Sequence, residues 1–257
     1  MDLLACRTCR GPVRAGFARC YQCDLARREA GSLLADAVAP IGYAIKGGPL
    51  AGDLWRYKSG RDGAAAASER LRDMLAAFLR DYGRCVWRAA GMTGRPAAAA
   101  VVPSGQGRPG PHPLAGIVRS CVALPMVRLS AGPAGAAHGR DVTIGWLRAS
   151  EPVAGADVLL ADDTWVSGGS AQSAAAALKL AGAARVAIVV LGRHLDPEDP
   201  RSQGLLRALS GQPAPSPGCP LHVGQILQNR LRPPYHYQLL RIPINFLIAR
   251  AKEIVSY

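Results

Sequence analysis

Short continuous apolar runs alternate along this chain with longer segments in which apolar residues recur at helical spacing. The runs at residues 98–102, 158–161 and 185–191 fit strands that are buried on both faces, as the central strands of parallel sheets are. Between residues 64 and 90, apolar side chains recur every three or four positions and predict a helix with one buried face. This alternation predicts an α/β fold, with a parallel sheet flanked by helices and right-handed crossovers.

Further elements follow from the same pattern. Residues 112–123 predict a helix that starts after a proline, and residues 126–129 predict a short strand. An alanine-rich helix is expected through residues 171–180, ended by Gly182. We therefore expect the sheet and its helices to occupy residues 31–195.

The two ends of the chain differ from this central part. Residues 1–30 contain closely spaced cysteines and form a separate small module. The prolines and glycines between residues 196 and 222 predict a linker. Residues 223–257 are interpreted as a C-terminal extension with a short amphipathic helix, whose apolar face would comprise Ile244, Leu247, Ile248, Ala251, Ile254 and Val255.

Charge and hydropathy narrow the class of protein. The 257 residues include 31 Lys and Arg against 18 Asp and Glu, a formal net charge of +13, so the surface should attract polyanions. No run of about 18 apolar residues is free of charge, which predicts the absence of a transmembrane segment. The opening residues lack the apolar core of a signal peptide, and we expect a cytoplasmic protein.

Four of the seven cysteines form two C-x-x-C pairs, and the spacing predicts a metal site. Each pair can place two thiolates on one ion, and two pairs complete a closed tetrahedron around a structural zinc. The predicted ligands of this minimal zinc ribbon are Cys6, Cys9, Cys20 and Cys23. Redox disulfides are the alternative, and they are less typical of a reducing compartment.

The sequence from residue 158 to residue 170, VLLADDTWVSGGS, combines a buried strand, an acidic pair and a glycine loop. The strand is predicted to end at Asp162 and Asp163, so that both carboxylates face the carboxyl edge of the sheet. The loop then offers backbone amides and hydroxyls at the start of the next helix, an arrangement that binds anions. Together they predict a ligand with vicinal hydroxyls beside a phosphate, such as a ribose 5-phosphate. Simple helix capping by Asp163 or Ser167 explains neither the double aspartate nor the paired glycines.

These residues resemble the phosphoribosyl pyrophosphate (PRPP) motif of type I phosphoribosyltransferases. In that family the acidic pair holds the ribose 2- and 3-hydroxyls, and the loop holds the 5-phosphate. The resemblance implies Asp162 and Asp163 as the catalytic pair. It implies a PRPP-binding set comprising Asp162, Asp163, Thr164, Val166, Ser167, Gly168, Gly169 and Ser170. Val166 stands where many members have threonine, so one hydroxyl that could donate to the phosphate is replaced by a methyl group.

The order of the motifs is similar to that of ComF-like phosphoribosyltransferases, a branch associated with DNA uptake in competent bacteria. Paired cysteines come first, then Tyr57-Lys58 with a basic glycine turn, a helix and the PRPP motif. The resemblance implies a pyrophosphate-binding loop, with Lys58 facing an anion, that includes Pro103, Ser104 and Gly105. A plain glycine-proline loop and an exposed lysine are the alternatives. Many ComF-like chains carry a mobile basic loop that residues 130–150 do not reproduce.

We therefore expect a PRPP-dependent phosphoribosyltransferase of nucleoside metabolism, with Mg²⁺ bound together with PRPP and Zn²⁺ in the ribbon. The acceptor would be a base, an amine or ammonia. A second hypothesis is a PRPP- or nucleotide-binding protein, or a DNA-uptake accessory, that has lost turnover. A third makes the arginine-rich zinc ribbon a module that binds single-stranded nucleic acid. A homodimer is also kept open.

Overall fold

The computed structural model describes residues 5–104, 112–134 and 139–210. Gly105, the second half of the expected linker and the expected helix of the C-terminal extension lie outside the described residues. The elements are α1 (Tyr21–Ala30), η1 (Gly31–Leu33), β1 (Ala37–Ile45), α2 (Pro49–Arg56), α3 (Ala64–Ala89), β2 (Ala98–Val101), α4 (Leu114–Cys121), β3 (Met126–Val127), β4 (Leu129–Ala131), β5 (Leu147–Ala149), β6 (Asp157–Trp165), α5 (Gly169–Leu180), β7 (Arg185–Leu195) and α6 (Pro200–Ser210).

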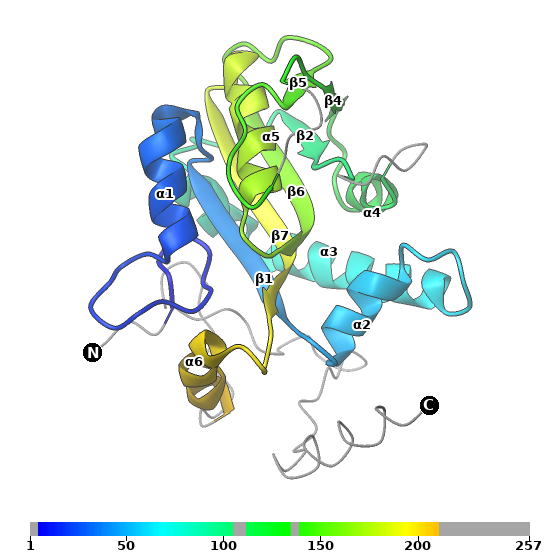
Figure 1. Ribbon diagram of the computed structural model, residues 1–257. Helices are drawn as coiled ribbons and strands as arrows, with labels where there is room; N and C mark the ends of the chain where they lie inside the picture. Colours follow the sequence, from blue (N-terminus) through cyan, green and yellow to red (C-terminus); the bar gives the residue numbers. More distant parts are fainter. Residues whose placement is uncertain (1–4, 105–111, 135–138, 211–257) are drawn as a thin grey trace.

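A five-stranded parallel sheet forms the centre of the molecule, in the order β1-β7-β6-β2-β3. Strands β4 and β5 pair antiparallel in a small second sheet. Helices cover both faces of the main sheet (Figure 1). The predicted α/β class is therefore confirmed, and its cause is the run of buried apolar residues in each central strand.

The two faces of the sheet carry different cores. On one face, α2, α3 and α4 bury large side chains such as Leu71, Leu75 and Phe78. On the other face, α5 packs through alanines, and the cysteine-containing segment joins the same cluster. Small side chains let α5 lie close to the strands. Gly182, with φ of 98°, then ends the predicted helix in the left-handed region.

Strand β6 continues past the position at which the sequence predicted its end. It runs through Asp162 and Asp163 to Trp165, because β7 pairs with it as far as Arg193. Strand β2 stops earlier, with Val101 opposite Ala161. The acidic pair therefore lies on a part of β6 that has a strand neighbour on one side only.

The ladder of strand pairs is interrupted at the acidic pair, although the register is the same on either side. The pairing of β1, β6 and β7 passes over one position in each strand, namely Ile41, Asp163 and Leu191. After these three positions, successive side chains still alternate between the two faces of the sheet, but one residue out of step with the side chains before them. Trp165 therefore joins the core cluster of the cysteine segment, instead of facing α2–α4 as Asp163 does.

The basic turn near Lys58 follows a helix, α2, which begins with Pro49 in its first turn. One segment differs from the sequence-based prediction. The stretch expected to be a linker contains helix α6, which buries Ser202 and Leu205. Among the described residues, no helix is both long and apolar enough to cross a membrane.

Candidate functional site

The four cysteines of the two C-x-x-C pairs converge on one point. Their sulfur atoms all lie within 4.8 Å of one another, and the Sγ atoms of Cys9 and Cys20 are 3.7 Å apart. A tetrahedral zinc with Zn–S bonds of about 2.3 Å places its sulfur ligands about 3.8 Å apart. None of the four forms a disulfide. The donor set and its spacing therefore fit a structural metal ion such as zinc.

Local backbone geometry explains this convergence. In the first knuckle, the amide of Cys6 donates to the carbonyl of Gly11 and Arg10 adopts a positive φ of 58°, so the chain turns back on itself. In the second, Cys20 is the N-cap of α1 and Cys23 lies in its first turn. Both motifs place the cysteines of a pair on one side of the chain.

The protonation of the four thiols is strongly coupled. Hydrogen bonds from neighbouring cysteines, Cys20 first, lower the pKa of Cys6 far below its ordinary value. The same kind of contact, again with Cys20 first, raises the pKa of Cys23 far above it. Sulfur atoms packed this closely cannot all ionise without a cation between them. A bound divalent metal would hold all four as thiolates.

Arg193 connects the cysteine cluster to the end of the sheet. Its guanidinium group donates to the carbonyl oxygens of Trp165 and His194, each at 2.8 Å. The same group lies directly against Gly11, where an added Cβ would stand 2.1 Å from Nη2. The glycine of the first knuckle therefore leaves the space in which the cysteine segment contacts Arg193, which in turn binds the carbonyl oxygen of Trp165.

The acidic pair is divided between the two faces of the sheet. Consecutive side chains of a strand point to opposite faces. Asp162 follows Val158 and Leu160 toward the face of α5, whereas Asp163 follows Leu159 and Ala161 toward α2–α4. The two carboxylates therefore do not form a single two-pronged group.

Asp163 has three partners from other elements. Its Oδ2 atom lies 2.5 Å from the hydroxyl of Tyr57, 2.5 Å from Nζ of Lys58 and 3.5 Å from Nε2 of His112. The carboxylate is buried, and the side chain of Lys58 is 26% exposed. This is a hydrogen-bonded ion pair at the carboxyl edge of the sheet.

The position of Tyr57 and Lys58 is fixed by another buried carboxylate. Asp53, in α2, accepts hydrogen bonds of 2.8 and 2.6 Å from Arg70 in α3, in a bidentate pair. Arg56 adds a contact of 3.2 Å to the same carboxylate. This network holds the end of α2 against α3 and thereby directs the next two residues toward Asp163.

Asp162 has a different electrostatic environment. Burial of its carboxyl group, followed by the nearby negative charge of Asp163, raises the pKa of Asp162 to about 8. The amide of Asp163 donates to its Oδ1 atom at 2.9 Å and opposes this shift only partly. Asp162 is therefore largely protonated near neutral pH in the absence of a ligand, and in that state it can donate a hydrogen bond.

The predicted phosphate loop joins β6 to α5. Val166 is 50% exposed, so its side chain does not enter the core. Gly168 has a φ of 91°, and an added Cβ would lie 2.1 Å from Cζ2 of the buried Trp165 ring. The Oγ atom of Ser167 accepts from the amide of Gly169 at 3.4 Å. Close packing therefore requires glycine at positions 168 and 169, independently of any role in anion binding.

The chain near residues 139–143 covers part of this loop. Carbonyl oxygens of Arg140 and Asp141 lie 2.7 and 2.6 Å from the point where a Cβ of Gly169 would be. The amide of Thr143 donates to Ser173 of α5 at 2.8 Å. Gln22 of α1 contacts Asp141 at 3.4 Å. Residues from three separate parts of the sequence therefore meet at the start of α5.

The predicted pyrophosphate loop follows β2, next to the acidic pair. The amide of Val102 donates to the carbonyl of Ala161 at 3.0 Å, which places Pro103 and Ser104 beside the exposed part of β6. Lys58, predicted to act with this loop, contacts Asp163. Thr164 and Ser170 are half-buried on either side of the phosphate loop.

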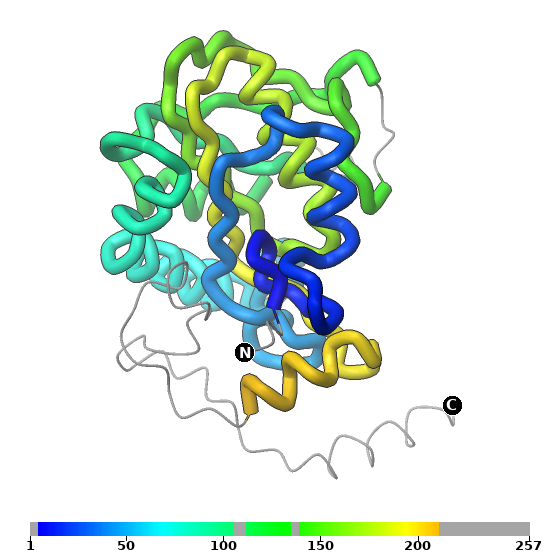
Figure 2. Tube along the Cα trace, turned by 90° about the vertical axis from the view of Figure 1, so that its left-hand side faces the viewer, coloured from blue at the N-terminus to red at the C-terminus, as the bar shows by residue number. Residues whose placement is uncertain are grey.

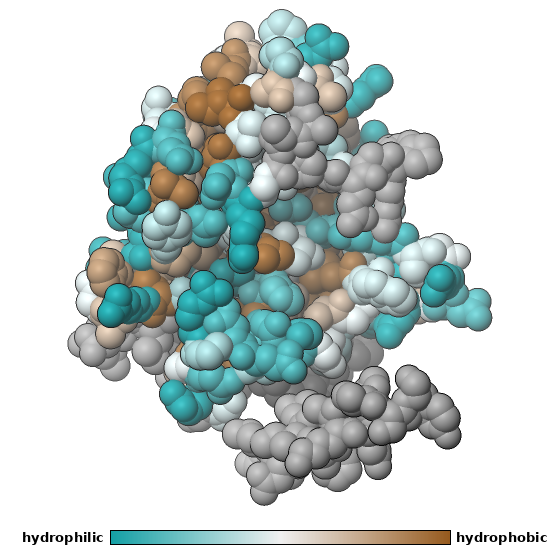
Figure 3. Space-filling model, in the orientation of Figure 1, coloured by the Kyte–Doolittle hydropathy of each residue, from teal (hydrophilic) through white to brown (hydrophobic). Residues whose placement is uncertain are grey.

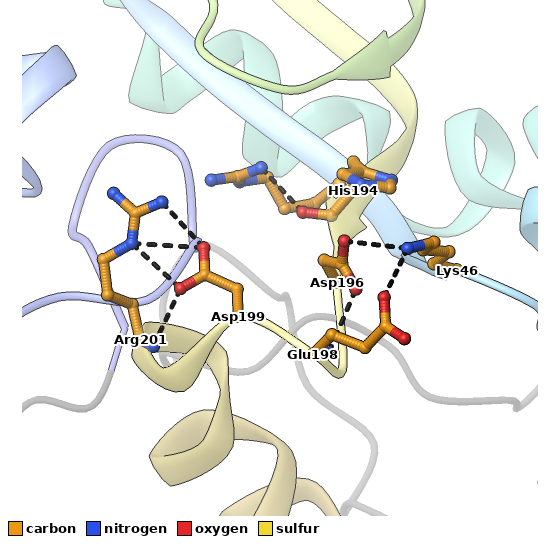
Figure 4. Close-up of polar contacts among 7 residues, drawn as sticks. Lys46, His194, Asp196, Glu198, Asp199 and Arg201 are labelled. Carbon is orange, nitrogen blue, oxygen red and sulfur yellow. Dashed lines mark hydrogen bonds and ion pairs between the residues drawn. The ribbon is translucent and has the colours of Figure 1, made fainter. Parts of the chain in front are cut away.

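At the ends of β1 and β7, charged side chains neutralise one another (Figure 4). Lys46 contacts Asp196 at 3.2 Å and Glu198 at 2.7 Å, and Arg201 contacts Asp199 at 2.7 Å. Burial lowers the pKa of the adjacent His194. The charged side chains at this part of the carboxyl edge are therefore paired with one another.

Sequence reasoning missed His112 and Tyr57 as partners of Asp163. His112 was one of several scattered histidines, and Tyr57 was noted only as part of a motif order. No local signal pairs them with Asp163, because the contact with Tyr57 spans 106 residues. The adjacency of Tyr57 and Lys58 is the one feature that could have suggested a joint role.

Comparisons with known proteins do not assign this chain to a family. A scan against models of protein families, a search of curated proteins and a search of solved structures each found no match.

Proposed function

We propose that this protein binds PRPP and transfers its phosphoribosyl group to an acceptor, with release of pyrophosphate. The observation that carries the proposal is the edge of β6 beyond the end of β2. There, carboxyl groups, a glycine loop at the start of α5 and the chain after β2 lie next to one another. A ribose 5-phosphate with a diphosphate on its anomeric carbon presents hydroxyls and anions in a complementary arrangement.

In this proposal each part of the edge has one role. Asp162 hydrogen-bonds the ribose hydroxyls, the amides and hydroxyls of the loop at residues 166–170 hold the 5-phosphate, and Ser104 lies near the diphosphate. The Asp163 carboxylate holds the Lys58 ammonium at the same edge, where it is near enough to attract the leaving pyrophosphate. Mg²⁺ bound with PRPP would neutralise the diphosphate charge. The protein mainly positions the substrate and excludes water, so no protein nucleophile is required.

Zinc has a structural role in this proposal. Four cysteine ligands leave no open coordination position for a substrate, and Cys6 and Cys9 are fully buried. The cluster would instead fix the segment that packs on Trp165 and Arg193. The resemblance to ComF-like phosphoribosyltransferases is consistent with this division between a metal ribbon and a catalytic sheet edge.

A second candidate function is binding of PRPP or a nucleotide without turnover. It is favoured by the state of Asp163, which already has Tyr57 and Lys58 within 2.5 Å. A carboxylate with these partners gains less from a ribose hydroxyl than an unpaired carboxylate would. Val166 favours the same candidate, because the loop has one hydroxyl fewer than is common in the family.

Calorimetric titration with PRPP, with and without Mg²⁺, tests both candidates. We expect binding by the wild type and up to about tenfold weaker binding by Asp162→Asn, because the neutral carboxyl group hydrogen-bonds a ribose hydroxyl and such a bond contributes about 0.5–1.5 kcal/mol. Asp157→Asn is the matched control, since Asp157 lies at the opposite end of β6. Absence of PRPP binding would contradict both candidates.

Pyrophosphate release against a panel of bases, amines and ammonia then separates the two candidates. Release that depends on both PRPP and one acceptor supports the transferase. PRPP binding with no release for any acceptor supports the binding protein instead.

A further inference from the structure

A groove with a volume of about 650 Å³ lies between the cysteine segment, α1 and α5. Figures 1 and 2 show α1 standing beside β1 and α5, and the groove lies among these elements. Neither Asp162 nor Asp163 lines it. The groove shares only the loop at residues 167–169 with the proposed PRPP site, and it extends away from the acidic pair toward η1 and the start of β1.

Basic side chains concentrate where the cysteine segment meets α5. Seven basic residues of the described ranges line the groove, among them Arg7, Arg10, Arg19 and Arg140, against three acidic residues, Glu29, Asp36 and Asp141. Within the described part of the chain, neither Arg7 nor Arg19 forms a salt bridge with an acidic residue. Figure 3, in the orientation of Figure 1, shows many hydrophilic residues over the region of α1. The local excess of positive charge matches a ligand with several negative charges.

Two buried donors at the same end have no partner. The indole Nε1 of Trp165 is buried without a hydrogen bond, although the residue is only 1% exposed. The Nε atom of Arg19 is likewise buried and unpaired. Trp165 and Arg19 both line the groove, together with the glycine loop at the N-terminus of α5. A buried donor without an acceptor is unfavourable, so a bound acceptor would stabilise this part of the groove.

The rest of the groove has a different character. Its walls between α1 and α5 include apolar Leu25, Leu34 and Val38, beside the buried amide of Gln172. The Oε1 atom of Gln172 already accepts from the amide of Ala35 at 2.9 Å, which fixes the side chain. A ligand that fits both parts has a polyanionic head and a flat, partly apolar body.

We propose that this groove is a second ligand site, which overlaps the PRPP site only at the loop of residues 167–169, and that it binds a nucleoside polyphosphate. The phosphate chain lies among Arg7, Arg19, Arg140 and the start of α5, with a phosphoryl oxygen accepting from Trp165 Nε1. The nucleoside lies between α1 and α5. A cavity of this volume is within the usual range for small-molecule and cofactor sites.

Binding of ATP, tripolyphosphate and adenosine, measured by calorimetry at about 150 mM salt, tests the proposal. At this ionic strength exposed charges separated by more than about 8 Å are largely screened. We expect ATP to bind more tightly than tripolyphosphate, and adenosine to bind weakly. Equal affinity for ATP and tripolyphosphate would overturn the assignment of the nucleoside.

Three variants locate the binding. Arg19→Met and Trp165→Phe should each weaken ATP binding at least fivefold, with folding checked by thermal denaturation. Arg14→Met is the matched control, because Arg14 is an exposed arginine of the same segment that does not line the groove. An equal loss in Arg14→Met would show general attraction to a basic protein and overturn the site.

Asp162→Asn separates this site from the PRPP site. It should leave ATP affinity unchanged even where it weakens PRPP binding. A similar loss of ATP affinity in Asp162→Asn would place the phosphates at the PRPP site and overturn the proposal. If the wild type fails to bind PRPP but ATP binding depends on Arg19, the proposed function fails and the second site stands.

Discussion

The cysteine cluster and the acidic pair are both built from closely spaced residues, but they reach opposite geometries. The four sulfur atoms converge within 4.8 Å, whereas the two carboxylates leave β6 on opposite faces. The cysteines lie in a tight turn and at a helix start, where residues two or three apart share one side. The aspartates are neighbours in a strand, where alternation separates them.

The two regions also differ in where along the chain their interacting residues come from. The cysteine cluster draws its four thiols from an 18-residue stretch (Cys6 to Cys23), and these could hold a metal ion. Asp163 obtains its partners from α2 and from the chain before α4, while Asp162 remains protonated up to a high pH. The cysteine cluster thus consists of residues that are close together in the chain, whereas the partners of Asp163 come from distant elements. The variants below test this contrast.

The largest effect is expected from removing a cysteine ligand. Cys6→Ser should abolish stoichiometric zinc and lower the free energy of unfolding by about 3 kcal/mol or more, because metal binding is coupled to folding. For a chain of this size, that corresponds to a fall in thermal midpoint of roughly 6–12 °C. Metal analysis and thermal denaturation provide the measurements.

Cys85→Ser is the control for this change, since Cys85 is half-buried in α3 and lies outside the cluster. It should retain one metal ion per chain. Wild-type protein that carries no zinc, or full stability of Cys6→Ser, would contradict the structural-metal interpretation.

Asp163→Asn should have the next largest effect. It removes the charge that contacts the Lys58 ammonium at 2.5 Å, and we expect a loss of about 2–3 kcal/mol in the free energy of unfolding. Urea denaturation at neutral pH measures the change. Asp162→Asn is the comparison and should not lower stability under the same conditions, because the carboxyl group that it replaces is largely protonated in the folded protein. Equal losses in the two variants would show that the aspartates do not differ as described.

The pH dependence of stability should also distinguish the two aspartates. The pKa of Asp162 is about 8 in the folded protein and about 3.9 in an unfolded chain. Between these values the folded state binds more protons, so the contribution of Asp162 to stability falls as pH rises. The slope is on the order of 1 kcal/mol per pH unit between pH 5 and 8.

Asp162→Asn removes this titration. Relative to wild type, the variant should gain stability as pH rises from 5 to 8, as measured by urea denaturation at several pH values. A constant difference between the two proteins across this range would show that Asp162 is ionised throughout.

The smallest effect is expected from a change of Val166, which is exposed in the loop between β6 and α5. If the loop holds the 5-phosphate, Val166→Thr supplies one additional hydroxyl donor and should tighten PRPP binding by about 0.5–1.5 kcal/mol. Ribose 5-phosphate should show the same gain and pyrophosphate none. Calorimetry that shows an equal gain for pyrophosphate would place a different group of the ligand at this loop.

Much of the architecture followed from the order of apolar segments. The runs at residues 98–102, 158–161 and 185–191 became β2, β6 and β7, and the helical pattern of residues 64–90 became α3. The end of β6 was predicted wrongly, because pairing with β7 extends the strand through polar residues. The helix α6 was missed because the proline- and acid-rich sequence before it resembles a linker.

The sequence by itself determined the features that depend on residues close together in the chain. The spacing of Cys6, Cys9, Cys20 and Cys23 led directly to a convergent cluster, because knuckles and helix starts have fixed local geometry. Only the tertiary structure decided which groups Asp163 contacts, that Arg193 lies against Gly11, and that Trp165 and Arg19, each with a buried unpaired donor, line one groove. These contacts depend on how the strands align and which helices cover each face, and residue spacing along the chain does not encode that arrangement.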